Sequence, residues 1–297
     1  FCYVEHAIKV GLDVDEFAPR LSFFFNSHLD FFEEIAKYRA ARRIWAQVMK
    51  EKYGAKSERS LKLRFHTQTA GFSLTAQQPQ NNISRTAFQG LAAVLGGTQS
   101  LHTNSMDETL ALPSQHAAEI ALRTQQLIAF ETGVANVVDP LGGSWYVEEL
   151  TDKMEKEAYN YFSKIDDLGG VIPAIEMGYF QREIAEAASD YQRRVDSKRR
   201  IVVGVNKFSK KNEEIEIPIL EIRNEVEREQ IEGLKSLRDN RDDQIVDEKL
   251  KAITDASRTK DNLMPLIIDA AQSHATLGEL VTSMRVVFGE WQETVVV

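Results

Sequence analysis

The chain has 297 residues, of which 43% are hydrophobic and 27% charged, as in ordinary soluble globular proteins of one large or two smaller domains. Its net charge is −9 and no basic segment stands out, so nucleic acid is excluded as an expected partner. No apolar run approaches the roughly 18–20 residues that cross a membrane, and no secretory signal is visible. Cys2 is the only cysteine, which excludes an internal disulfide and favours a reducing, cytoplasmic compartment.

The first 140 residues alternate between short strand-like runs and helices. Residues 1–11 have the pattern of the second half of a helix, which suggests that residues are missing upstream. Strands are predicted at 17–25, 61–68 and 98–103. Helices are predicted at 28–53, at 81–97 with an Asn cap and a Gly-Gly end, and at 113–133. This repetition predicts parallel strands joined by crossover helices.

Helices dominate after the segment DPLGGSW, residues 139–145. They are predicted at 146–168, 172–197, 226–239, 242–257, 263–274 and 277–289. One further strand is predicted at 200–208, and residues 209–222 are charged and then extended. We therefore predict two domains, residues 1–140 and residues 141–297, and interpret the charge-rich stretch 223–260 as a solvated helical face.

Polar and apolar side chains alternate along the predicted second strand, in the segment KLRFHTQTAG. The apolar face carries Leu63 and Phe65, with Thr67 beside them. The other face carries Arg64, His66 and Gln68. The alternation alone leaves open which of the two faces is buried.

Five segments together resemble the large subunit of adenosylcobalamin-dependent acyl-CoA mutases, the family of methylmalonyl-CoA and isobutyryl-CoA mutases. They are KLRFHTQTAG, DEFAPRLSFFF, NNISRTAFQGLAAVLGGTQSLHTNSMDETLALP, DPLGGSWYVEELTDKMEKEA and IVVGVNKF. The resemblance runs over essentially the whole chain but covers only the later part of that family's catalytic domain. It implies the C-terminal part of a TIM (β/α)8 barrel, with about three parallel strands and crossover helices, followed by a mostly helical C-terminal region.

The resemblance also implies which strand face is inside. Family barrels are threaded by the pantetheine arm of coenzyme A and are lined with small and polar side chains. We therefore expect Arg64, His66 and Gln68 to point inward, and Leu63 and Phe65 to lie under the surrounding helices.

For the acyl-CoA substrate, the resemblance implies contacts from Arg20, Leu21, Ser22 and Gln68. Arg20 and Ser22 are two residues apart, so we expect them on one strand face, where a guanidinium offers directional donors to phosphate or a thioester chain. The alternative for Arg20 is a structural ion pair at a strand end. Gln68 offers both a donor and an acceptor, and the alternative is that neighbouring backbone satisfies it.

For the cofactor, adenosylcobalamin, the resemblance implies contacts from Gly71, Glu108 and Ala111. Gly71 either lets a ligand approach the backbone or makes a plain turn. Glu108 either accepts hydrogen bonds from a ribose diol or places favourable charge at the start of the next helix. No metal site is predicted, because the histidines are scattered without metal-ligand spacing. Supporting contacts around the ligands are expected from His66, His102 and Asn104.

The chain departs from the family pattern in residues that carry chemistry. Phe72 stands where many methylmalonyl-CoA mutases have Trp, and the family's catalytic residues lie upstream of Phe1, so none is assigned here. The cobalamin-binding pattern Asp-x-His-x-x-Gly is absent, as in mutases that carry it on a separate subunit. The expected partners are the missing N-terminal part of the barrel, a small cobalamin-binding subunit and further copies in a dimer or heterotetramer.

The resemblance implies a radical carbon-skeleton rearrangement of an acyl-CoA thioester, first of all (R)-methylmalonyl-CoA to succinyl-CoA. Isobutyryl-CoA or a hydroxyacyl-CoA is the alternative, because the residue that reads a substrate carboxylate lies outside the chain. A rival of another class is a non-catalytic fragment that docks to a cobalamin-binding subunit, and the isolated chain is expected to be inactive. A lyase or aldolase lacks a Schiff-base lysine context or a metal triad.

Overall fold

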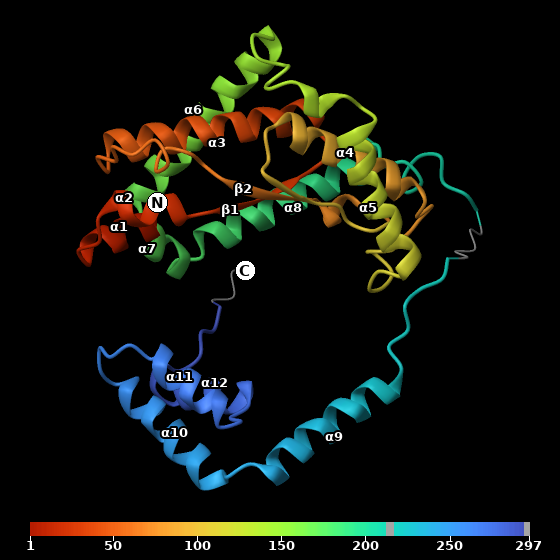
Figure 1. The fold of residues 1–297 in the computed structure, drawn as a ribbon. Coiled ribbons are helices and arrows are strands. Elements are labelled where there is room, and N and C mark those ends of the chain that lie inside the picture. The colour runs from red at the N-terminus through yellow and green to blue at the C-terminus, as the bar shows by residue number, and fades with distance from the viewer. Residues whose placement is uncertain (212–216, 294–297) are drawn as a thin grey trace. The chain divides into compact units, whose positions relative to one another are not determined.

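The structure, a computed structural model, describes residues 1–211 and 217–293. The chain divides into two compact units (Figure 1), one of residues 1–220 and one that begins at Glu221. Among the described helices, none combines the length and the apolar character that crossing a membrane would need.

A three-stranded parallel sheet forms the centre of the first unit, with its strands in chain order. The strands are β1 (Phe23–Ser27), β2 (Phe65–Thr69) and β3 (Ser100–His102). Helix α3 (Phe31–Glu51) connects β1 to β2, α4 (Asn81–Leu95) connects β2 to β3, and α5 (Gln115–Phe130) follows β3. The predicted α/β arrangement of parallel strands and crossover helices is confirmed, whereas closure into a barrel stays a prediction.

The first strand begins later than predicted. Two short helical turns, α2 (Val14–Phe17) and η1 (Ala18–Arg20), occupy the residues before it. Pro19 lies inside the second turn, where its fixed φ suits a helical conformation. Arg20 and Ser22 therefore precede β1, and the prediction that they share a strand face is wrong. Arg64, likewise, lies just before β2 rather than within it.

The ends of α4 show which local signals hold. Its N-cap is Gln80 without a side-chain cap hydrogen bond, so the predicted Asn cap is wrong; Asn81 Nδ2 instead donates to Gln78 Oε1 at 3.0 Å. The predicted Gly-Gly end is confirmed. A Cβ on Gly96 would lie only 2.2 Å from Cδ2 of Tyr38, so glycine allows α4 to end against α3.

The helices after residue 140 also follow the prediction only in part. Helix α6 (Trp145–Asp167) packs along α3, and a single predicted helix over 172–197 is instead two, α7 (Val171–Glu176) and α8 (Tyr179–Asp196). The break falls at Gly178, whose φ of 68° few other residues adopt. No strand forms at 200–208, where the structure has only an isolated bridge between Val203 and Lys207.

Because α6 packs on α3, residues after 140 belong to the same compact unit as the sheet. The break between the compact units follows residue 220. The change near residue 140 is thus a change in secondary structure, and as a domain boundary it stays a prediction.

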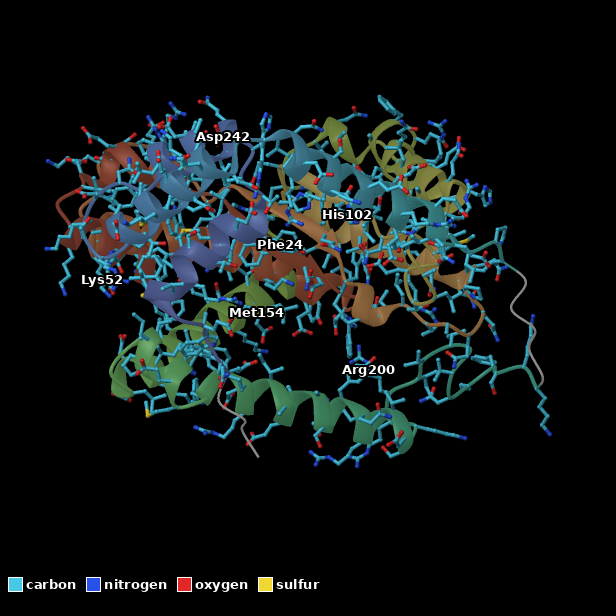
Figure 2. The ribbon with its side chains drawn as sticks, turned by 90° about the horizontal axis from the view of Figure 1, so that it is seen from below. Phe24, Lys52, His102, Met154, Arg200 and Asp242 are labelled. Carbon is cyan, nitrogen blue, oxygen red and sulfur yellow. The ribbon has the colours of Figure 1, made fainter. Side chains whose placement is uncertain are left out.

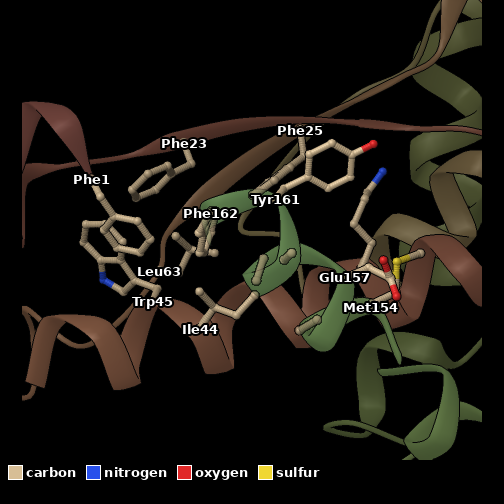
Figure 3. Close-up of a pocket in the computed structure, with 14 residues that line it drawn as sticks. Phe1, Phe23, Phe25, Ile44, Trp45, Leu63, Met154, Glu157, Tyr161 and Phe162 are labelled. Atoms are coloured by element: carbon tan, nitrogen blue, oxygen red, sulfur yellow. The ribbon is translucent and has the colours of Figure 1, made fainter. Parts of the chain in front are cut away.

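Ionic contacts join α6 and the loop before it to α3. Arg39 pairs with Asp139 and Glu148, and Arg43 pairs with Asp152 and Glu155. A cavity of about 430 Å³ lies between β1, α3 and α6 (Figure 3). Its wall is mostly aromatic and aliphatic and includes Phe23, Phe25, Ile44, Trp45 and Phe162. Phe1, next to helix α1 (Cys2–Lys9), stacks on Trp45 with ring centroids 5.6 Å apart.

The second unit is helical throughout its described regular elements. It contains α9 (Asn224–Asn240), α10 (Asp243–Ala256), α11 (Met264–Gln272) and α12 (Leu277–Phe288). A small core joins α10, α11 and α12 through Ile253, Ala270 and Leu280. Helix α9 buries none of its residues, which agrees with a solvated face in this charge-rich stretch.

The structure shows which face of the sheet is covered. Phe65 and Thr67 are at most 2% exposed, and Phe65 stacks on Tyr38 of α3 with ring centroids 5.1 Å apart. Leu63 joins the same core, so the predicted placement of Leu63 and Phe65 under the helices is confirmed. The covered face of the sheet means below the face that carries Phe25, Phe65, Thr67 and Leu101.

The opposite, open face carries two rows of neighbours across the strands. In the strand register, Asn26 faces Gln68, which faces His102; the second row is Phe24, His66 and Ser100. Phe24 and His102 come from the two outer strands (Figure 2), and Phe24 is 59% exposed. His66 and Gln68 are half-buried, so the polar side chains of β2 share the face that the helices leave open.

Candidate functional site

The carboxyl ends of β2 and β3 bring several predicted residues together. Gln68 lies near the end of β2, and its Nε2 donates to Oδ1 of Asn104 at 3.1 Å. Asn104 follows β3 by two residues. Because parallel strands end at the same edge of a sheet, residues far apart in the sequence meet here, where ligands of α/β folds commonly bind.

The backbone holds Asn104 firmly. The residue is 2% exposed; its backbone N–H donates to Oγ1 of Thr69 at 2.9 Å, and its carbonyl accepts from Oγ1 of Thr86 at 3.4 Å. Its side-chain Nδ2 is buried and has no hydrogen-bond partner in the described parts of the chain. An unsatisfied buried amide costs about 1–3 kcal/mol, so an acceptor on a ligand would stabilise the site.

Gly71 lies where Asn104 and Glu108 converge. A Cβ on Gly71 would lie 2.9 Å from Nδ2 of Asn104 and 3.3 Å from Oε1 of Glu108. The amide donor and the carboxylate acceptor are therefore both close to one backbone position that only glycine leaves open. The site can bind hydroxyl groups, which donate to a carboxylate and accept from an amide.

The loop that carries Glu108 is anchored from within. Asn82 Nδ2 donates to the carbonyl of Met106 at 2.9 Å, and the backbone N–H of Ser114 donates to Oδ2 of Asp107 at 2.9 Å. Glu108 itself is exposed and lines a hollow of about 640 Å³. The same hollow is lined by His102, Ser105, Ala111 and Gln125. Glu108 precedes α5 by seven residues, too far to act on the start of that helix.

The two candidate histidines differ in their surroundings. His66 Nδ1 lies 2.8 Å from Oγ of Ser100, a neighbour in the strand register. His102 is exposed at the edge strand and lines the hollow beside Glu108. In the described residues, no group of three or more His, Cys, Asp or Glu side chains could hold a metal ion.

The structure places Arg20, Leu21 and Ser22 at the other end of the sheet. They precede β1, whereas Gln68 is level with Asn26, the fourth residue of that strand. At about 3.3 Å per residue, the two groups are separated by roughly 15 Å along the strands. Arg20 and Ser22 are exposed, and Leu21 packs against the core. The predicted substrate residues therefore do not form one cluster.

Arg64 has a contact that the sequence did not predict. Its Nη2 donates to the carbonyl oxygens of Pro19 and, at 3.3 Å, Leu21. It thereby holds the turn that presents Arg20 against the start of β2. A half-buried arginine beside a helical turn is the only signal in the sequence for such a role, and it is too general to find the partner.

The chain matches the family model described as Methylmalonyl-CoA mutase over residues 1–290. The chain belongs to the methylmalonyl-CoA mutase family. It is 45% identical over 293 residues to the 2-hydroxyisobutanoyl-CoA mutase large subunit of Aquincola tertiaricarbonis, covering 98% of this chain and 52% of that protein. The family resemblance stated from the sequence motifs is thus confirmed.

Other members of the mutase family are equally similar. The chain is 46% identical to methylmalonyl-CoA mutase of Escherichia coli, covering 97% of this chain and 40% of that protein. It is 43% identical to the mitochondrial methylmalonyl-CoA mutase of Homo sapiens, covering 97% and 38%. This member of the mutase family spans about half the length, or less, of these relatives.

Proposed function

We propose that the chain supplies substrate- and cofactor-binding parts of an adenosylcobalamin-dependent mutase that rearranges the carbon skeleton of acyl-CoA thioesters. The first candidate pair is (R)-methylmalonyl-CoA and succinyl-CoA. The observation that carries the proposal is the convergence of Gln68, Asn104, Gly71 and Glu108 at the carboxyl end of the sheet. Membership of the mutase family supports the reaction class.

The residues at the carboxyl end suit the adenosyl part of the cofactor. The Glu108 carboxylate would accept hydrogen bonds from a ribose diol, and the partnerless Nδ2 of Asn104 would donate to one. Gly71 leaves room for the approach, and Ala111 and His102 would line the remaining space. When bound, adenosylcobalamin supplies the radical chemistry through homolysis of its cobalt–carbon bond.

The substrate would lie along the open face of the sheet. Arg20 and Ser22 at the amino end suit the polar parts of coenzyme A, and Gln68 at the other end suits the thioester. An extended molecule bridges a separation of this size, which explains why the substrate residues need not cluster. The chain's own task is to bind and orient the substrate and to exclude water from it.

The remaining parts of the enzyme are proposed from the resemblance. Further strands would close a barrel around the open face, and a small subunit would bring the cobalamin, within a dimer or heterotetramer. The catalytic residues would lie upstream of Phe1, so His66 keeps only a supporting role beside Ser100. A cytoplasmic location stays a prediction.

A second candidate substrate is a hydroxyacyl-CoA. It is favoured by the 45% identical relative, which is named as the large subunit of a 2-hydroxyisobutanoyl-CoA mutase. Assays with both thioesters on the assembled enzyme separate the candidates. The non-catalytic rival predicts that no thioester is rearranged in the presence of partners and cofactor.

The cofactor role is tested by Glu108→Gln in the assembled enzyme. Loss of the charged acceptor is expected to weaken adenosylcobalamin binding about tenfold or more, because hydrogen bonds to a carboxylate are strong. Glu119→Gln is the matched control, since Glu119 is exposed on α5 and pairs with Arg123. Spectroscopic titration gives both affinities. Equal affinities in the two variants would refute the assignment of Glu108.

A further inference from the structure

A separate cavity of about 580 Å³ lies beyond the carboxyl end of β1. Its wall comes from the residues between β1 and α3, from α4, from α8 and from the segment that follows α8. It shares no lining residue with the hollow at Glu108. The proposed function assigns nothing to this cavity, although its size is typical of small-molecule sites.

Arg85 of α4 lines the cavity and is 8% exposed. Its Nη1 donates to Oγ1 of Thr75 at 2.9 Å and to Oδ1 of Asn82 at 2.7 Å, and its Nη2 donates to the carbonyl of Val203 at 2.7 Å. All three acceptors are neutral. Burial lowers the pKa of Arg85, because no carboxylate among the described residues offsets the cost of burying this charge.

Arg200 supplies a second guanidinium from the segment after α8 (Figure 2). It lies over the ring of Tyr191, 4.8 Å from the ring centroid, and is half-buried. No ion pair of Arg200 occurs within the part of the chain that the structure describes. The cation–π contact holds the side chain at the cavity wall without neutralising it.

The other charged groups around the cavity leave an excess of positive charge. Asp30 is the carboxylate that lines it, and Glu34 nearby is paired with Lys37. Phe31, the first residue of the long helix α3, also lines the cavity and brings the positive end of the helix dipole. Burial, followed by the charge of Arg200, lowers the pKa of His28, which places that imidazole close to the guanidinium.

We propose that this cavity binds a small molecule through an anionic group, a phosphate or a carboxylate, held by Arg85 and Arg200. Arginine suits both anions because its planar donors match their oxygens. Tyr191, Ile201 and Val202 form an apolar wall for the remainder of the ligand. The proposal stands whether or not the chain acts on acyl-CoA, since it uses different residues.

Isothermal titration of the full chain with inorganic phosphate and, separately, with malonate tests this site. Saturable millimolar or tighter binding is expected for at least one probe, and the preferred probe tells a phosphate ligand from a carboxylate ligand. Arg200→Gln is expected to weaken binding about tenfold. Its backbone carbonyl, which accepts from Nδ2 of Asn206 at 2.7 Å, is untouched by the substitution.

Arg199→Gln is the matched control, because Arg199 is exposed and does not line the cavity. Its affinity is expected to equal that of the unchanged chain. Arg85→Lys, which keeps the charge but loses the planar fork, is expected to weaken binding less than Arg200→Gln does. Absence of saturable binding of both probes up to about 10 mM, or equal weakening by Arg199→Gln and Arg200→Gln, would overturn the proposal.

Discussion

The covered and open faces of one short sheet have different physical tasks. On the covered face, Phe65 and Thr67 are almost fully buried under α3 and α4. On the open face, their neighbours His66 and Gln68 are half-buried and polar. The difference teaches that alternate residues of a single strand can be divided between stability and binding. Substitutions on each face can break or sharpen this division.

The largest effect is expected from Phe65→Ala on the covered face. Removing this ring from its contacts with Phe25 and Tyr38 should lower the free energy of unfolding by about 3–5 kcal/mol. Phe24→Ala is the matched control on the open face, where 59% exposure predicts a cost of about 1 kcal/mol or less. Urea unfolding measures both, and similar losses would end the division between the faces.

Gly71→Ala should affect binding more than folding. Its Cβ would crowd Nδ2 of Asn104 at 2.9 Å, so one of the two cofactor groups must move. We expect adenosylcobalamin affinity in the assembled enzyme to fall about tenfold, with a small change in unfolding free energy. Gly233→Ala, in open space on α9, is the control and should leave affinity unchanged. An unaltered affinity for Gly71→Ala would contradict the site.

Gln68→Ala sharpens the comparison within the open face. It removes the hydrogen bond to Asn104, and we expect a stability loss of about 1 kcal/mol together with a raised KM for the thioester. Steady-state kinetics of the assembled enzyme measure the change. His66→Ala, whose Nδ1 contacts Ser100 only, should raise KM less. A larger effect from His66→Ala would reverse the assigned roles.

The smallest effect is expected far from both faces, in the second unit. Hydrogen bonds from Arg241 lower the pKa of Glu279 to about 2, from a usual 4.5. Because the folded-state pKa is depressed, the stabilisation is present above pH 4.5 and is lost as the pH falls toward 2. Solvent screening limits it to about 1 kcal/mol.

Glu279→Gln should remove this pH dependence and leave ligand binding on the sheet unchanged. Urea unfolding of the two proteins between pH 6 and about 3 gives the difference as a function of pH. The difference should shrink as the pH falls. A difference that stays constant over this range would show that the ion pair does not contribute.

The alternation in KLRFHTQTAG was enough to predict the covered face, because period-two patterning carries that information directly. The turn at Ala18–Arg20 could not be predicted, since it depends on donors from Arg64, which lies 45 residues away from Pro19. The break at Gly178 was missed because a helical pattern continues on both sides of it.

The candidate site was predicted from family motifs rather than from residue chemistry alone. Gly71 and Glu108 do meet, as do Gln68 and Asn104, but no local pattern shows that Nδ2 of Asn104 is left without a partner. The pairing of Arg85 with Arg200 around one cavity was not predicted either. Both features depend on which loops the sheet brings together.

The hydrogen bond between Gln68 and Asn104 has a direction, and that direction reaches across the site. Since Oδ1 of Asn104 accepts from Gln68, its other end must present a donor toward Gly71 and Glu108. A glutamate at position 68 would have no proton to give at neutral pH, and the asparagine would gain by turning around. Its oxygen would then oppose the carboxylate of Glu108, so a single exchanged atom at one ligand would be felt at the other.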